Sequence, residues 1–213
     1  MLNRRPHDGQ AGAAPGVAPV VVAAIGVALF WTGAVSAALA SPGYSQVGDY
    51  LSRLAARGSD VAPWAIGAFV ASAVAHAAGA YALHQAAARH GRRRLHVAAV
   101  ALALAALMVL AIAGFRLSAS GPGDLLDSLH ALAVIGYQLA WVVAVLARGP
   151  GVRGVAVAAV STVLLMASLS WGEYAGLLQR AWVVLDQAWL LTITVLAVRA
   201  AAGRGRGPAQ DPV

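Results

Sequence analysis

The stretch LHVAAVALALAALMVLAIAGF, residues 95–115, decides the fold class of this chain. It contains no aspartate, glutamate, lysine or arginine. A helix needs roughly 20 mostly apolar residues to cross a hydrocarbon layer about 30 Å thick, because in lipid every backbone N–H and C=O must be paired within the segment. The stretch therefore predicts a transmembrane helix.

Five further stretches meet the same requirement, in a chain of 213 residues that is 60% hydrophobic and 11% charged. This composition is far from that of soluble domains. The sequence predicts an all-α polytopic membrane bundle of six transmembrane helices in one domain, residues 17–199. Residues 1–16 and 200–213, rich in Gly, Pro, Ala and Arg, are expected to be disordered cytoplasmic tails. The expected spans are 17–40, 63–86, 95–115, 129–147, 152–171 and 181–198.

Arginine alternates between the loops. Eleven of the fifteen basic residues lie in the two tails and in the loops after the second and fourth spans. Because basic residues collect in cytoplasmic loops, both termini are predicted to be cytoplasmic. The run before Ala40 is too long for the apolar part of a usual signal peptide, which favours a retained span. Abundant Ala, Gly, Val and Arg without lysine suggests a GC-rich bacterial genome, and hence a multi-pass protein of the bacterial plasma membrane.

The composition also restricts the chemistry. Cysteine is absent, which excludes disulfides, thiolate metal sites and a cysteine nucleophile. No phosphate-binding glycine loop, His-Glu-x-x-His or Gly-x-Ser-x-Gly motif is present. The cluster Arg92-Arg93-Arg94 beside a span is typical of contact with anionic lipid rather than with nucleic acid. Membrane lipids are therefore the expected partners, whereas protein partners and cofactors stay undetermined.

The longest external loop contains a polar island, GYSQVGDYLSRLAARGSD, residues 43–60. Within it, residues 49–56 are predicted to form a short amphipathic helix with Leu51 and Leu54 inward. Arg53 and Arg57 are expected to point toward lipid headgroups, and Ser45 to cap the helix start. We expect this segment to cover the bundle.

Polar side chains within spans are costly in lipid and are therefore candidates for function. Asp127 and His130 share one stripe of the fourth helix and can touch. Asp186 lies deeper in the sixth helix, and His76 lies on one face of the second with Ser72. Together with Asp49 and Ser52, which the external cap would place near His130 and Arg180, these residues give seven candidate binding residues: Asp49, Ser52, His76, Asp127, His130, Arg180 and Asp186.

Three of the seven are also candidates for catalysis or metal binding: His130, Asp127 and Asp186. A carboxylate beside a histidine can orient the ring, accept a proton or help to bind a metal. The structural alternatives are capping of the fourth helix by Asp124 or Asp127, and a hydrogen-bonded core role for His76.

Three stretches together resemble the bacterial membrane family called domain of unknown function 998: YSQVGDYLSRLAA, GFRLSASGPGDLLDSLHALAV and GLLQRAWVVLDQAWLL. The resemblance implies a six-helix fold and no particular activity. The residues that match the family's recurrent pattern are Asp49, Ser52, Leu54, His130, Gly176, Leu177, Arg180 and Trp189. One departure follows Arg116, where the acids come later than expected, at Asp124 and Asp127.

Three functions remain open at this point. The first is a membrane protein with a small polar pocket on the outer side that binds a lipid or small molecule. The second is a metal-dependent hydrolase of a lipid-linked substrate that uses His130 with Asp127 or Asp186. The third is a small-solute or proton-coupled transporter, for which Asp186, His130 and His76 would outline a path.

Overall fold

The computed structural model describes residues 16–118, 123–149 and 151–203. Within these ranges six helices are long and apolar enough to cross a membrane. The all-α prediction is therefore confirmed. The long helices are α1 (Ala18–Leu39), α3 (Ala62–His90), α4 (Arg93–Gly114), α5 (Leu125–Arg148), α6 (Val152–Ser170) and α7 (Ala175–Ala202). The short elements are α2 (Leu51–Leu54) and the 3-10 helix η1 (Gly172–Tyr174).

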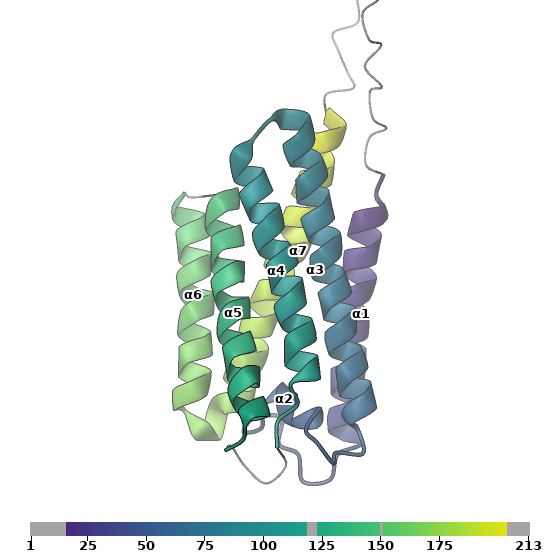
Figure 1. Cartoon of the computed structure of the whole chain (residues 1–213), viewed down its shortest axis with the longest axis vertical. Helices are drawn as coiled ribbons and strands as arrows, with labels where there is room; N and C mark the ends of the chain where they lie inside the picture. Colours follow the sequence, from purple (N-terminus) through teal and green to yellow (C-terminus); the bar gives the residue numbers. More distant parts are fainter. Residues whose placement is uncertain (1–15, 119–122, 150, 204–213) are drawn as a thin grey trace, which may run out of the picture.

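The long helices stand side by side, with the start of α1 and the end of α7 at one end of the bundle and α2 at the other (Figure 1). We call these the terminal end and the cap end. Consecutive helices pack together from α1 through α3 and α4 to α5, and α7 packs against α1, α3 and α6. Residues of α7 can therefore reach side chains from most of the bundle.

Three helices are longer than the predicted spans, and the first of them, α3, ends at His90 rather than at 86. α7 begins at Ala175 and ends at Ala202, whereas the hydropathy pattern gives 181–198, and α5 begins at Leu125 rather than near 129. The added turns carry polar residues such as Gln179, Arg180 and Asp127. A hydropathy window registers only the apolar part of a helix, so it missed these turns. Residues 200–202 accordingly continue α7 rather than the predicted tail.

The polar island forms the cap end of the bundle. Leu51 and Leu54 of α2 are buried, as predicted. The prediction for Ser45 was wrong, because the residue at the start of α2 is Tyr50 and no side chain caps it. Ser45 instead closes the preceding turn, where its Oγ accepts a hydrogen bond from Gly48 N at 3.0 Å. We call residues 41–61 the cap segment.

The terminal half of the bundle is mostly apolar, although it contains buried Thr194, whose hydroxyl donates to the Leu190 carbonyl oxygen at 2.7 Å. Leu83, Leu102, Trp141 and Leu190 are each fully buried there, one or two turns nearer the terminal end than His76, Tyr137 and Asp186. Gly79 lies at the boundary, where a Cβ atom would come within 2.7 Å of Leu190 Cδ1. Side-chain packing therefore closes the bundle below its middle.

The pair α1 and α3 provides a test of this close packing. A Cβ at Gly26 would lie 2.6 Å from the Ala71 carbonyl oxygen, whereas Gly67 has open space around it. We expect Gly26→Val to destabilise the bundle by about 1–3 kcal/mol, as overpacking usually does, and Gly67→Val to leave it nearly unchanged. Unfolding in mixed micelles measures both, and equal stability of the two variants would contradict the packing described here.

Candidate functional site

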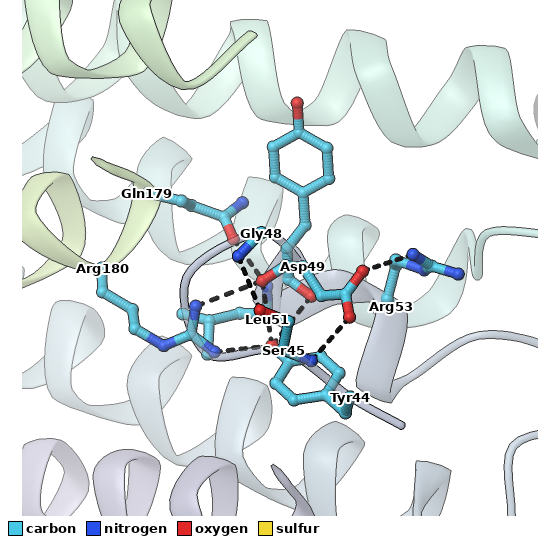
Figure 2. A network of polar contacts seen from close by, with 9 residues as sticks. Tyr44, Ser45, Gly48, Asp49, Leu51, Arg53, Gln179 and Arg180 are labelled. Atoms are coloured by element: carbon cyan, nitrogen blue, oxygen red, sulfur yellow. Dashed lines mark hydrogen bonds and ion pairs between the residues drawn. The ribbon is translucent and has the colours of Figure 1, made fainter. Parts of the chain in front are cut away.

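Arg180 of α7 fastens the cap segment to the bundle. Its Nη1 donates to the Asp49 carbonyl oxygen at 3.1 Å and to the Gly176 carbonyl oxygen at 2.8 Å, and its Nη2 donates to Tyr44 Oη at 2.6 Å. Figure 2 shows the guanidinium reaching Tyr44 and Asp49 while the Asp49 carboxylate turns away toward Arg53. Burial raises the pKa of the Tyr44 hydroxyl, although Arg180 acts in the opposite direction.

The backbone of the cap segment comes very close to α7. A Cβ at Gly176 would lie 2.3 Å from the Asp49 carbonyl oxygen, so only glycine fits. One turn further along, Gln179 Oε1 accepts a hydrogen bond from Leu51 N at 2.6 Å. The cap backbone therefore uses polar groups of α7 as hydrogen-bond partners.

The other side of the cap segment is held by arginines too. Arg116 donates from Nε to the Ala55 carbonyl oxygen and from Nη2 to the Ala56 carbonyl oxygen, both at 2.8 Å. Arg57 pairs with Asp124, and Arg53 with Asp49. Arg53 and Arg57, which the sequence predicts to point toward lipid headgroups, thus each bind a nearby carboxylate.

Asp124, Asp127 and His130 organise the start of α5. Asp124 Oδ1 caps the helix by accepting a hydrogen bond from Asp127 N at 2.9 Å. The Asp127 carboxylate accepts from the backbone N–H of Ser118 at 2.7 Å and of Gly123 at 3.1 Å. His130 Nδ1 binds the Phe115 carbonyl oxygen at 2.7 Å. Asp127 and His130 thus each bind backbone that precedes α5.

A cavity of about 50 Å³ lies between α2 and the middle of the bundle. Its walls are mostly apolar, with polar groups at a few points. The apolar lining residues include Phe30, Leu51, Phe69, Val109, Ile112, Val134 and Val183. The polar lining residues include Ser52, Ser72, His76, His130, Tyr137, Gln179 and Gln187. The structure thus brings three predicted binding residues, Ser52, His76 and His130, to one cavity.

Gln187 has an unused hydrogen-bonding group beside this cavity. Its side-chain oxygen accepts from Trp31 Nε1 at 2.7 Å, but its Nε2 is buried without a partner among the described residues. The residue is only 3% exposed. A buried amide N–H without an acceptor is costly, so it marks a place where a ligand or water oxygen would be stabilising. Sequence reasoning missed Gln187 because a neutral amide in an apolar span gives no charge signal.

The floor of the cavity continues into a polar network across four helices. His76 Nδ1 binds the Ser72 carbonyl oxygen at 2.8 Å and its Nε2 lies 3.2 Å from Tyr137 Oη. Tyr137 Oη lies 3.3 Å from Asp186 Oδ2, and Ser161 Oγ donates to Asp186 Oδ1 at 2.8 Å. Asp186, His76 and Tyr137 are all buried. This network joins α3, α5, α6 and α7.

The three candidate metal ligands do not converge. His130 and Asp127 bind backbone near the cap end, whereas both Asp186 oxygens are engaged by hydroxyl groups deeper in the bundle. The described part of the chain contains no group of three or more His, Asp or Glu side chains placed to hold a metal ion. A usual catalytic zinc site needs three protein ligands.

Comparison with known proteins identifies one family. The family model described as protein of unknown function (DUF998) matches residues 24–196, which cover all six long helices in whole or in large part. No curated protein and no solved structure shows significant similarity to the chain.

The hydrogen bonds of Arg180 to the cap segment, which we call the arginine clamp, predict that Arg180→Gln weakens the attachment of this segment. A hydrogen bond to a charged group contributes about 1.5–3 kcal/mol. We therefore expect the Leu51 amide to exchange with deuterium about tenfold faster or more in Arg180→Gln than in the wild type. Arg53→Gln is the matched control, because its ion pair is exposed and contributes little. Similar exchange in the two variants would contradict the clamp.

The Asp124 cap predicts that the local stability of the start of α5 depends on pH at low pH. Hydrogen bonding from Asp127 N, followed by Arg57, lowers the pKa of the Asp124 carboxyl. Its stabilising effect is therefore complete above the ordinary aspartate value of about 4 and is lost as pH falls through the lowered pKa. We expect the Asp127 amide to lose exchange protection in that window. Asp124→Asn, which caps without ionising, should remove the dependence, and Asp60→Asn should retain it.

Proposed function

The chain belongs to the DUF998 family of proteins of unknown function, and from that premise we propose that it is a multi-pass protein of the bacterial plasma membrane that binds a lipid or small molecule in the capped cavity. The cap end faces outward in this proposal, in keeping with the excess of arginine at the terminal end. Ligand would then approach from the outer leaflet.

The observation that carries the proposal is the combination of apolar walls with a few fixed polar groups, one of which lacks a partner. Ligand sites usually have this composition, because apolar contact supplies affinity and the polar groups fix orientation. His130, His76 and Tyr137 contribute polar groups to the cavity lining, and the Gln187 amide has an N–H to donate. A ligand with an oxygen acceptor and an apolar body fits these groups.

The size of the cavity restricts the ligand. About 50 Å³ holds a few water molecules, whereas drug-sized ligands occupy about 300–1,000 Å³. A lipid would therefore place only one small group in the cavity, or the cap segment would move when it binds. Because the cap segment is held to the long helices through the arginine hydrogen bonds described above, breaking those bonds would let it shift without unfolding a long helix.

Neither alternative function has comparable support. Metal-dependent hydrolysis requires convergent ligands, and the described residues provide no such group. Transport requires polar groups on both sides of the membrane centre, yet fully buried Leu83, Leu102 and Leu190 follow His76 toward the terminal end. The polar groups thus favour a site open toward one side.

Filling the cavity tests the proposal. Val183 lines the cavity and its neighbour Val184 points outward, with 52% of its surface exposed. We expect a lipid or small molecule to copurify with the wild-type protein and with Val184→Trp, as observed by native mass spectrometry. Val183→Trp should lose it because the larger side chain occupies the cavity.

Gln187→Leu provides a second variant with nearly unchanged volume. It removes the unpaired N–H, so the bound molecule should dissociate more readily while the fold persists. Equal ligand content in Val183→Trp and Val184→Trp would contradict binding in this cavity.

A further inference from the structure

We propose that Asp186, Tyr137 and His76 together hold a single shared proton, and that the Tyr137 hydroxyl passes it between the carboxyl group and the imidazole. This site goes beyond ligand binding in the cavity, since its ligand is a proton and it rests on hydrogen bonds that need no other ligand.

The three groups form a continuous chain. Tyr137 Oη lies between His76 Nε2, at 3.2 Å, and Asp186 Oδ2, at 3.3 Å. The hydroxyl has one hydrogen to donate and lone pairs to accept. It can therefore donate in one direction only, and must accept from the other side if both contacts are hydrogen bonds.

The Ser72 carbonyl fixes the histidine. It accepts from His76 Nδ1 at 2.8 Å and has no proton to give, so Nδ1 must carry a hydrogen. Whether His76 is charged then depends on Nε2 alone. The bond to Ser72 thus turns Nε2 into the one variable position of the ring, directly facing Tyr137.

Two arrangements satisfy every contact in the chain. In the first, protonated Asp186 donates to Tyr137 Oη and the tyrosine donates to neutral His76. In the second, charged His76 donates to Tyr137 Oη and the tyrosine donates to ionised Asp186. One shift interconverts them: the Asp186 O–H bond breaks as a new O–H forms on Tyr137, and the original Tyr137 O–H breaks as an N–H forms on His76.

The remaining protonation states leave either a hydrogen-bonding group without a partner or a net charge in the apolar interior. Without the proton, ionised Asp186 and neutral His76 compete for a single tyrosine hydrogen. With a second proton, the Asp186 O–H can turn to Ser161 Oγ, which lies 2.8 Å from Oδ1, but the three groups then carry the net positive charge of the His76 imidazolium in the apolar interior. Unpaired buried charges and buried polar groups without partners are both costly, so the three groups together are matched to one proton.

The groups around Asp186, Tyr137 and His76 do not decide where the shared proton lies. The Asp186 carboxylate is also hydrogen-bonded by Ser161 of α6 and by the Trp182 side chain of α7, neither of which titrates in this range. The cavity lining contributes His130 of α5, which binds the Phe115 carbonyl oxygen, and neutral residues from α1, α4 and α7. Among the described residues, Asp186 forms no ion pair with an arginine.

The shared proton explains how an acid is tolerated in the apolar interior. An isolated charge there is expensive, whereas the chain is neutral overall in both arrangements. Because Tyr137 and His76 also line the cavity, a polar group placed there would favour one arrangement over the other. Cavity occupancy and proton position are thereby coupled.

The test measures both ends of the chain in the full-length protein at neutral pH. Infrared spectroscopy detects the C=O stretch of a protonated Asp186, assigned by its absence in Asp186→Asn. Nitrogen-15 NMR of labelled histidine reports the charge of His76, assigned with His76→Gln and His130→Gln. We expect a protonated acid with a neutral imidazole, an ionised acid with an imidazolium, or a mixture of the two whose fractions sum to one proton.

Both groups protonated, or both deprotonated, would overturn the proposal. Tyr137→Phe and Ser161→Ala then form a matched pair, because each removes one hydroxyl from Asp186. Tyr137→Phe should change both the carboxyl band and the His76 signal, whereas Ser161→Ala should change the carboxyl band alone. An unchanged His76 signal in Tyr137→Phe would also overturn the relay, and if that variant does not fold the wild-type proton count still decides.

Discussion

The contact between the cap backbone and α7 is the constraint on which the cap end of the structure depends. An irregular segment at the edge of a membrane must find partners for its backbone groups. Here Arg180 donates to the Asp49 carbonyl oxygen, Arg116 donates to those of Ala55 and Ala56, and Gly176 leaves room for the approach. These arginines therefore serve as hydrogen-bond partners of the backbone, which accounts for their place at the cap end.

The features between the cap end and the middle of the bundle depend on this contact between the cap segment and α7. Because α2 lies over the helices, the cavity beneath it is small and mostly apolar, and polar lining residues such as Gln179, His76 and His130 are held by hydrogen bonds. Its floor is a hydrogen-bonded chain from His76 to Asp186 rather than a continuing channel. Below that chain the leucines and Trp141 pack closely, and the hydroxyl of buried Thr194 lies among them and donates to the Leu190 carbonyl oxygen at 2.7 Å. One structure thus combines a clamped cap, a cavity and a buried acid.

Much of the fold was predictable from the sequence, since apolar length alone locates six spans and leucine spacing places α2 inward. The partners of the polar residues were not predictable. Asp127 and His130 share a helix stripe, yet each binds backbone before α5, because two open N–H groups and a carbonyl lie nearer. The cavity role of Gln187 was missed for a different reason: a neutral amide resembles its apolar neighbours until the structure shows its unpaired nitrogen.

We propose that the cavity opens outward beneath a cap held by Arg180. The chain contains no cysteine, so Ser72→Cys would place a single thiol in the cavity lining. Its reaction with a small membrane-impermeant reagent, applied to intact cells and to inside-out vesicles, measures access from each side. We predict slow labelling from outside only, faster when Arg180→Gln is added. Labelling from the cytoplasmic side, or a rate unaffected by Arg180→Gln, would contradict the account.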